Sequence, residues 1–240
     1  MTDFGLPRCE RALVLSPHPD DEALGPGGTI LRLNAAGAVS RVVFLTDGER
    51  LYGDPNPEVA EKRRDEGVRS SALLGCREPF FLGFPDGRLA SCTQEVCRRL
   101  SGIIAEERPD IVFAPSPIDH HPDHIATAGA ALSLLESEGG LRLAFYEVYS
   151  TLRFTHLIEV TDVVERKKEA ILTYRTSLYG NPHLYLRAAL GLNAHRALFV
   201  QSEGFYEALY IVENTGEADT LPDRLCYKDL QPGRVQKATE

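Results

Sequence analysis

The chain has 240 residues, of which 43% are hydrophobic, and its formal net charge at pH 7 is −9. This length and apolar content are sufficient for one large domain with a buried core. An acidic surface repels phosphate backbones and anionic lipids, so nucleic-acid binding and membrane-surface binding are disfavoured.

The sequence shows no sign of export or membrane insertion. It has no basic start followed by a long apolar stretch, and no uncharged apolar run of about 18 residues or more. We therefore expect a cytoplasmic protein. The cysteines form no CxxC pair, which favours unpaired thiols in a reducing compartment. They are Cys9, Cys76, Cys92, Cys97 and Cys226.

Short apolar runs alternate with segments of helical periodicity along most of the chain. The expected strands are residues 11–16, 41–46, 79–84, 110–116 and 141–150. The expected helices are residues 23–36, 58–75, 94–107 and 125–137. Strands separated by single helices predict a parallel sheet with right-handed crossovers. The predicted fold class is α/β, a Rossmann-like, doubly wound, mostly parallel sheet with helices on both faces.

After residue 150 the alternation weakens. Further strands are expected at residues 156–161 and 205–212, a helix at 162–174, and an aromatic-rich loop at 174–196. We predict a single domain over residues 1–240. Its parts are a Rossmann-like core at about 10–175, a substrate-specificity region at about 176–220 and a polar tail at 221–240, partly disordered at its end.

Two polar segments directly follow the first and the fourth expected strands. The first is SPHPDDE, residues 16–22, and the second is PSPIDHHPDH, residues 115–124. In a doubly wound sheet the ligand site lies beyond the carboxyl ends of the strands, where the strand order reverses. This point usually falls between the first and fourth strands, so the two segments are expected to meet in space.

The residue types of these segments suit a divalent metal ion. Catalytic zinc commonly takes three histidine or carboxylate ligands and keeps a fourth position for water. His18, one of the two following aspartates and a histidine of the second segment would supply three ligands, and the spacing leaves open which aspartate binds. The other aspartate could take a proton from water, and a second histidine could stabilise an oxyanion or protonate a leaving amine.

Together the motifs resemble those of the zinc-dependent deacetylases of the LmbE/PIG-L family. PHPDDE and HPDH carry most of the resemblance, and TDGE, RRDEGVRSSALLG and FLGFPDG accompany them in order, over roughly residues 11–175. The resemblance implies that Zn²⁺ is the cofactor, although such ligands also accept Fe²⁺. It implies that His18, Asp21 and His124 are the metal ligands and that Asp20 is the general base.

The resemblance also implies further site residues. His121 matches the catalytic histidine that assists the oxyanion or the leaving group, and Asp86 belongs to the FPDG turn. Arg63 and Glu66 fall where the family has residues near the substrate pocket. We also predict that Asp119 belongs to the substrate site, where it could orient a histidine.

One stretch departs from the family pattern. Some members use a tyrosine shortly before HPDH as an oxyanion donor, whereas residues 118–120 are Ile-Asp-His in this chain. Tyr174, Tyr179 and Tyr185 in the aromatic-rich segment are alternative donors that the sequence does not rank.

The predicted function is metal-dependent hydrolysis that removes the N-acetyl group from a GlcNAc-type amino sugar or glycoconjugate. The expected partner is a small amino-sugar substrate, and a homo-oligomer is left open. Two alternatives remain. A site of two histidines and one carboxylate also suits a non-haem iron oxygenase, although that class usually occurs on all-β scaffolds. A non-catalytic sugar-binding module would have no need of a spare Asp20 beside the ligand set.

Overall fold

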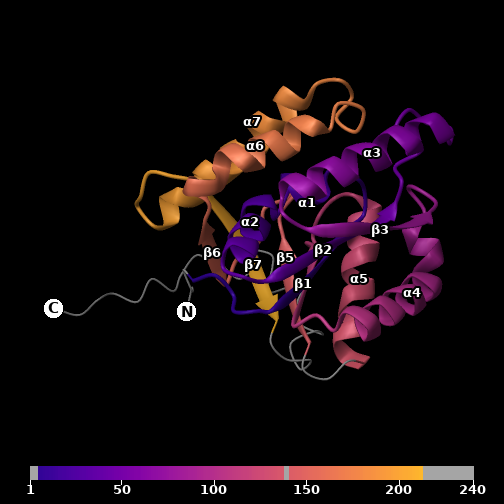
Figure 1. Cartoon of the computed structure of the whole chain (residues 1–240), viewed down its shortest axis with the longest axis horizontal. Helices are drawn as coiled ribbons and strands as arrows, with labels where there is room; N and C mark the ends of the chain where they lie inside the picture. The colour runs from indigo at the N-terminus through magenta and orange to yellow at the C-terminus, as the bar shows by residue number, and fades with distance from the viewer. Residues whose placement is uncertain (1–4, 138–140, 213–240) are drawn as a thin grey trace, which may run out of the picture.

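The computed structural model describes residues 5–137 and 141–212 (Figure 1). The predicted polar tail and Cys226 lie outside the described residues. The strands are β1 (Arg11–Ser16), β2 (Val39–Thr46), β3 (Arg77–Phe84), β4 (Ile111–Pro115), β5 (Arg142–Tyr146), β6 (His156–Glu159) and β7 (Tyr206–Val212). The helices are α1 (Asp21–Leu24), α2 (Gly27–Ala35), α3 (Pro57–Leu73), α4 (Thr93–Glu107), α5 (Pro122–Ser137), α6 (Val164–Thr173) and α7 (Pro182–Arg196).

The described strands form one seven-stranded sheet in the order β3-β2-β1-β4-β5-β7-β6. Strands β1 to β5 run parallel, with Arg11 of β1 opposite Val39 of β2 and Ala12 opposite Ile111 of β4. Strand β7 runs antiparallel to both β5 and β6. The chain moves outward from β1 to β3 and then crosses back to β4, so the strand order reverses between β1 and β4. The predicted fold class is confirmed.

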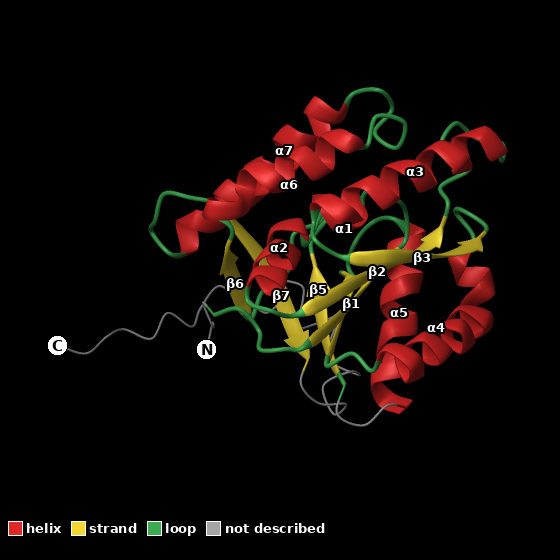
Figure 2. Ribbon diagram, in the orientation of Figure 1, coloured by secondary structure: helices red, strands yellow, loops and turns green. Residues whose placement is uncertain are grey.

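Alternate residues of the central strands pack into two hydrophobic cores, one on each face of the sheet. On β1, Leu13 and Leu15 pack with α4 and α5, whereas Ala12 and Val14 pack with α2 and α6. Figure 2 shows α4 and α5 on one side of the sheet and the other helices on the opposite side. A strand that is buried on both faces is apolar at every position, which explains the continuous run ALVL in β1.

The segment between α6 and β7 differs from its prediction. The sequence predicts a loop over residues 174–196, and this is wrong for Pro182–Arg196, which form α7. Pro182 starts the helix, where its missing N–H group would have no partner in any case. The buried positions of α7 include the polar Asn193 and Arg196 as well as Ala189. The segment therefore lacks the apolar stripe by which a helix is recognised in a sequence.

Two other predicted elements, a helix and a strand, differ from those in the structure. The expected helix at 23–36 is divided into α1 and α2, because Pro26 lies between them and cannot continue a helix. The expected strand at 141–150 ends at Tyr146.

Gly28 permits the close packing of α2 against Val160. A Cβ atom at this position would lie 2.6 Å from the Cβ of Val160, which leaves space only for glycine.

The described cysteines are all free thiols, in agreement with the prediction for that part of the chain. Among the described residues, no helix combines the length and the apolar character needed to cross a bilayer.

A buried ion pair connects α6 and β7 to the start of α2. Lys167 Nζ lies 2.6 Å from Glu207 Oε1 and donates hydrogen bonds to the carbonyl of Gly25 and to Asn193 Oδ1, each at 3.0 Å. The Glu207 carboxylate also accepts two N–H groups from the first turn of α2, both at 2.7 Å. These N–H groups have no partner within the helix, so Glu207 stabilises its start.

We expect Lys167→Met to lower the free energy of unfolding by about 3–5 kcal/mol, because it leaves Glu207 as a buried charge without its cationic partner. Lys168→Met is the matched control, since Lys168 on the same helix pairs with Glu165 at the surface. That change should have little effect. Urea denaturation of both variants measures the difference, and equal losses would contradict the proposed importance of the buried pair.

Candidate metal centre and pocket

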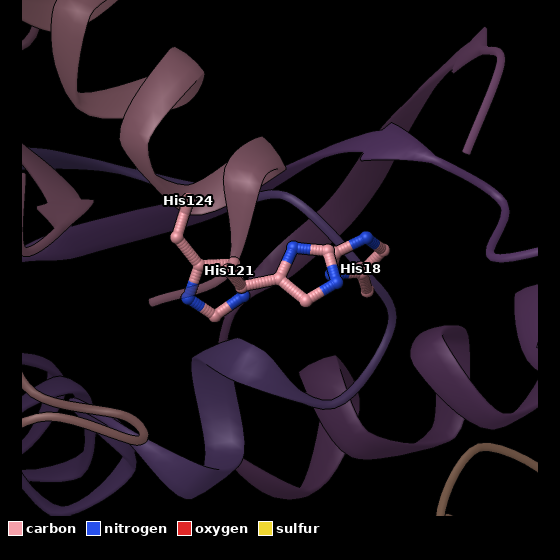
Figure 3. A group of neighbouring side chains, drawn as sticks. All are labelled: His18, His121 and His124. Atoms are coloured by element: carbon pink, nitrogen blue, oxygen red, sulfur yellow. The ribbon is translucent and has the colours of Figure 1, made fainter. Parts of the chain in front are cut away.

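Histidines from two distant segments meet at the carboxyl end of the sheet. His18 belongs to the β1–α1 loop, His121 directly precedes α5, and His124 lies in the first turn of that helix. The ring centroid of His18 lies 4.6 Å from that of His121 and 5.6 Å from that of His124 (Figure 3). The segments after β1 and β4 therefore meet at the point where the strand order reverses, as the sequence predicts.

Asp21 lies between two of these histidines. Its Oδ2 atom is 3.3 Å from His18 Nδ1 and 3.3 Å from His124 Nε2. Asp21 Oδ1 and both ring nitrogens of His124 are buried and make no hydrogen bond. Buried polar atoms are normally hydrogen-bonded, so the unpaired Oδ1 of Asp21 and the unpaired ring nitrogens of His124 fit a cation bound close to them. Two imidazole nitrogens and a carboxylate oxygen are a suitable donor set for zinc.

A second group of side chains near His18 could also contact a cation. His18 Nε2 lies 3.1 Å from Asp86 Oδ1 and 3.3 Å from Asp123 Oδ2. However, Asp123 accepts the N–H groups of Gly87 at 2.7 Å and Leu89 at 3.0 Å. Asp21 accepts one N–H, from His18 at 2.9 Å on Oδ2, and its Oδ1 atom has no hydrogen bond. The Asp21 carboxylate thus keeps more free acceptor capacity than that of Asp123, which favours the His18–Asp21–His124 set.

The charges of the donor set favour an ionised Asp21. Burial opposes ionisation of this carboxyl, but His124 and His18 outweigh it and hold its pKa well below the usual range. For His124, burial favours the neutral ring, yet Asp21 and Asp119 raise its pKa to about 9. A cation that binds His124 must displace a proton at neutral pH, so its affinity should increase as the pH rises.

Asp119 supports the histidines from behind the pocket. Its Oδ2 atom lies 3.5 Å from His124 Nδ1 and accepts the N–H of Tyr149 at 3.2 Å. Its Oδ1 atom accepts the N–H of His121 at 3.0 Å. The residue is buried and does not line the pocket, although the sequence predicts a place in the substrate site. A carboxylate behind a metal-binding histidine usually fixes the orientation of the ring.

A pocket of about 440 Å³ opens over His18 and His121. Its other lining residues are Asp20, Arg50, Leu51, Gly53, Arg63, Asp86, Gly87, His120, Tyr149, Ser177, Tyr179 and Tyr185. Of the predicted site residues, His18, Asp20, Arg63 and His121 therefore line the cavity itself.

Asp20 is held in a strained conformation at the pocket wall. Its φ of 145° is rare for a residue other than glycine, and such strain costs about 1–3 kcal/mol. Arg63 Nη2 lies 3.3 Å from Asp20 Oδ2. Burial raises the pKa of Asp20 well above the usual range, and the Arg63 charge opposes this increase. The surrounding structure thus presents a buried carboxylate with a raised proton affinity.

Arg63 connects three loops around Asp20. Its guanidinium donates to the carbonyl of Gly48 at 3.0 Å, to the carbonyl of Pro19 at 3.0 Å and to Ser177 Oγ at 2.9 Å. Gly48 has a φ of 63°, and a Cβ atom at this position would lie 1.9 Å from Arg63 Nη1. Only glycine leaves space for the arginine here.

Glu66, which the sequence predicts at the substrate site, contacts the loop between α6 and α7. Its carboxylate accepts the N–H of Thr176 at 2.7 Å and both the N–H and the hydroxyl of Ser177 at 3.1 Å. Glu66 does not line the pocket over the histidines. These hydrogen bonds indicate that Glu66 positions the loop between α6 and α7.

His121 presents a defined tautomer to the pocket. Its Nδ1 atom accepts the N–H of Asp123 at 3.2 Å. The neutral ring must therefore carry its proton on Nε2. Burial and the charges of His18 and His124 lower the pKa of His121, so the neutral ring is favoured.

The three tyrosines proposed from sequence have different positions. Tyr179 and Tyr185 line the pocket, whereas Tyr174 is buried and donates to Glu22 Oε1 at 2.5 Å. Tyr149 also lines the pocket, and its ring stacks on His124 with centroids 5.5 Å apart. Sequence analysis missed Tyr149 because it assigned this residue to a strand.

Asp123 and Ser177 also contribute to the site but were not named from sequence, and Asp86 was named there only as part of the FPDG turn. Asp86 and Asp123 stand in FPDG and HPDH, two motifs that follow strands of the sheet. Acidic residues at strand ends could have indicated them. No local pattern indicates Ser177, which reaches Arg63 only because α6 packs beside α3.

The fold and the donor set together define an α/β protein whose histidine and aspartate side chains could hold a cation at the strand-order reversal. The PIG-L family, described as GlcNAc-PI de-N-acetylase, matches residues 13–135. The chain belongs to this family.

Relatives with stated activities agree with this assignment. Diacetylchitobiose deacetylase of Thermococcus kodakarensis is 30% identical over 187 residues, and the match covers 70% of each chain. The 1D-myo-inositol 2-acetamido-2-deoxy-alpha-D-glucopyranoside deacetylase of Mycobacterium avium is 35% identical over 143 residues, and the match covers 48% of each chain. This chain thus spans about half the length of that relative.

A solved structure shows the same architecture. The N,N'-diacetylchitobiose deacetylase of Pyrococcus horikoshii, complexed with its inhibitor MPG, superimposes with a TM-score of 0.71 at 26% identity. The superposition covers 85% of this chain and 84% of that enzyme.

We expect Asp119→Asn to weaken Zn²⁺ binding by about tenfold to a hundredfold, because the amide can no longer orient His124 as a carboxylate does. His120→Ala is the control, since the neighbouring His120 side chain is 72% exposed. Competition titration with a chelator measures both affinities. Unchanged affinity in Asp119→Asn would rule out the positioning role.

Glu22, next to Asp21, is a buried carboxyl whose titration should affect stability. Its Oε1 atom accepts the hydroxyls of Ser70 at 2.6 Å and Tyr174 at 2.5 Å. Burial raises the pKa of Glu22 to about 7 from its ordinary value of 4.5. The folded protein therefore keeps a proton that the unfolded chain releases between these pH values.

Metal-free protein should lose stability as the pH rises from 4.5 to about 7, by up to about 3 kcal/mol from this group alone. The stabilisation is complete below the unfolded pKa and is lost as the pH passes the folded pKa. Glu22→Gln should remove this part of the dependence, whereas the exposed Glu169→Gln should retain it. Urea denaturation in the presence of a chelator at several pH values measures the slopes, and parallel slopes for all three proteins would refute the assignment.

Proposed function

We propose that this protein is a metal-dependent hydrolase that removes the N-acetyl group from a GlcNAc-type amino sugar or glycoconjugate, and that Zn²⁺ is its metal. The observation that carries the proposal is a buried donor set, His18, Asp21 and His124, beside a carboxylate at the pocket wall, Asp20. The names of the relatives from Thermococcus kodakarensis and Mycobacterium avium support the substrate class.

The ion would be held by His18 Nδ1, Asp21 Oδ2 and His124 Nε2. Bound zinc would supply positive charge that polarises an amide carbonyl and makes water more acidic. Asp119 would hold the His124 ring toward the ion, because its carboxylate lies at the other ring nitrogen.

Asp20 would accept a proton from the attacking water. It lines the pocket, and burial raises its pKa, which increases its affinity for that proton. Arg63 limits this increase, so that the carboxylate can still ionise before the reaction. The three loop contacts of Arg63 would also keep the Asp20 carboxylate in one orientation, which general-base catalysis requires.

His121 would act on the other side of the reacting carbonyl. The neutral ring carries a proton on Nε2, and this N–H can donate a hydrogen bond to a developing oxyanion. Asp20, which has taken a proton from the attacking water, would pass it to the leaving amine as the C–N bond breaks. The products would be acetate and the free amino sugar.

The direct test is amine release from free N-acetylglucosamine, an N-acetylglucosamine disaccharide and an N-acetylglucosamine–inositol conjugate. Metal-stripped enzyme should be inactive, and added Zn²⁺ should restore release without oxygen. Turnover that consumes oxygen would favour an oxygenase. Sugar binding without any turnover would favour a binding module.

Asp20→Asn should reduce kcat by about 10²–10⁴-fold with little loss of bound Zn²⁺, because the amide cannot accept the proton. Asp65→Asn makes the same chemical change at an exposed position of α3 and should keep full activity. Initial rates and metal content, measured on the same preparations, separate catalysis from metal binding. Full activity in Asp20→Asn would exclude the proposed base.

A further inference from the structure

The ring of Tyr149 packs against the face of His124. The two ring centroids are 5.5 Å apart and the ring planes differ by 20°, so the rings are stacked. Asp21 Oδ2 and Asp119 Oδ2 lie at the two ring nitrogens of His124, at 3.3 Å and 3.5 Å. The carboxylates thus contact the edge of the imidazole, and the tyrosine contacts its face. A stacked aromatic pair at this distance is attractive beyond the area that it buries.

Tyr149 is held by a carboxylate that also contacts His124. Asp119 Oδ2 accepts the backbone N–H of Tyr149 at 3.2 Å. The same oxygen atom lies 3.5 Å from His124 Nδ1. One oxygen atom of a buried carboxylate therefore joins the backbone after β5 to the ring of a candidate metal ligand.

Arg196, the last residue of α7, holds both ends of the segment that contains Tyr149. Its Nε donates to Glu147 Oε2 at 3.1 Å, and its Nη2 donates to Glu147 Oε1 and to the carbonyl of Leu152 at 3.0 Å. Glu147 Oε1 also accepts the N–H of Leu152 at 2.7 Å. Arg196 and Glu147 are both buried, so water competes little for these bonds. Residues 147–152 therefore form a loop that one arginine closes at its base.

These contacts connect α7 to the candidate metal centre. Arg196 fixes the two ends of the 147–152 loop, the loop carries Tyr149, and Tyr149 contacts His124. Tyr149 and Arg196 both lie outside residues 13–135, which the family model matches. A guanidinium suits this place because its planar fork donates several hydrogen bonds in fixed directions.

We propose that Tyr149 and Arg196 are positioning residues for the candidate metal centre. Arg196 closes the 147–152 loop, and the loop holds the Tyr149 ring against His124. The inference rests on the proposed function, because it takes His124 as a zinc ligand. A fixed imidazole ring keeps its nitrogen directed at the ion, and loss of a group that orients a metal-binding histidine commonly weakens metal binding by about tenfold to a hundredfold.

The first experiment measures Zn²⁺ affinity and needs no turnover. Competition with a chelator should show about tenfold weaker binding in Tyr149→Ala, because this change removes the ring that packs on His124. Tyr149→Phe keeps the ring and should bind Zn²⁺ as the wild type does. Tyr52→Ala is the control for loss of a tyrosine, because Tyr52 is 64% exposed and its ring contacts Tyr179, with centroids 5.7 Å apart. Unchanged affinity in Tyr149→Ala, or an equal loss in Tyr149→Phe, would overturn the proposal.

The second experiment tests whether Arg196 acts through Tyr149. Arg196→Lys keeps a positive charge beside Glu147 but loses the fork that also bonds to Leu152. It should weaken Zn²⁺ binding by about tenfold when Tyr149 is present and should add little in the Tyr149→Ala background. Arg187→Lys, at an exposed position of the same helix, should change neither affinity. Equal losses in both backgrounds, or no loss in either, would overturn the role of Arg196.

The Co²⁺-loaded protein gives a signal that a general loss of stability does not change. Nitrogen and carboxylate ligands that bind Zn²⁺ also bind Co²⁺, whose visible absorption depends on the arrangement of its ligands. At saturating Co²⁺, the bands of Tyr149→Ala should shift relative to the wild type, whereas those of Tyr149→Phe and Tyr52→Ala should not. Identical spectra in all these proteins would overturn the positioning role. The tyrosine variants leave the Arg196–Glu147 pair intact, so they test the proposal even if Arg196→Lys does not fold.

The positioning role and the proposed function can fail separately. If Tyr149→Ala weakens Zn²⁺ binding but the wild type releases no acetate from any substrate, the proposed function fails and the positioning role stands. If the wild type releases acetate but Tyr149→Ala binds Zn²⁺ as the wild type does, the positioning role fails and the hydrolase stands.

Discussion

A buried carboxylate shared by two imidazoles is the interaction on which the rest of the site depends. Asp21 lies within 3.3 Å of ring nitrogens of both His18 and His124, and thereby connects the loop after β1 to the helix after β4. Isolated buried charges are costly, so this group of atoms is stable only with compensating charge, from protonated rings or a cation. The requirement for positive charge therefore comes from the fold itself, which removes these groups from water at the strand-order reversal.

A set of supporting residues surrounds this centre, and each joins loops from different parts of the chain. Asp119 contacts His124 and the backbone of the two segments that begin after β4 and β5. Arg63 and Glu66 extend from one helix, α3, toward the loops at Asp20 and at Ser177. These contacts allow Asp20 to keep its strained backbone conformation, because hydrogen bonds on several sides determine its position.

The family match covers only part of the residues that line the pocket. The family match covers residues 13–135, which include the β1 and β4 segments with the donor set. Tyr179 and Tyr185 lie beyond it, in the region where α6 and α7 add a layer beside α3. Part of the pocket lining thus comes from a region outside the family match.

The sequence by itself determined the parallel α/β fold and the meeting of HPDD with HPDH, because apolar runs alternate with helices and polar motifs follow their strands. It could not assign Asp21 over Asp20 from spacing, since both directly follow the same strand. Only the tertiary structure showed that Glu66 and Asp119 contact loops and histidines behind the pocket, because both partners come from other segments. Packing likewise decided the helix α7, since a helix with polar buried residues shows no apolar periodicity in the sequence. It also decided the contact between Tyr52 and Tyr179, since these residues lie on two loops that are distant in the sequence.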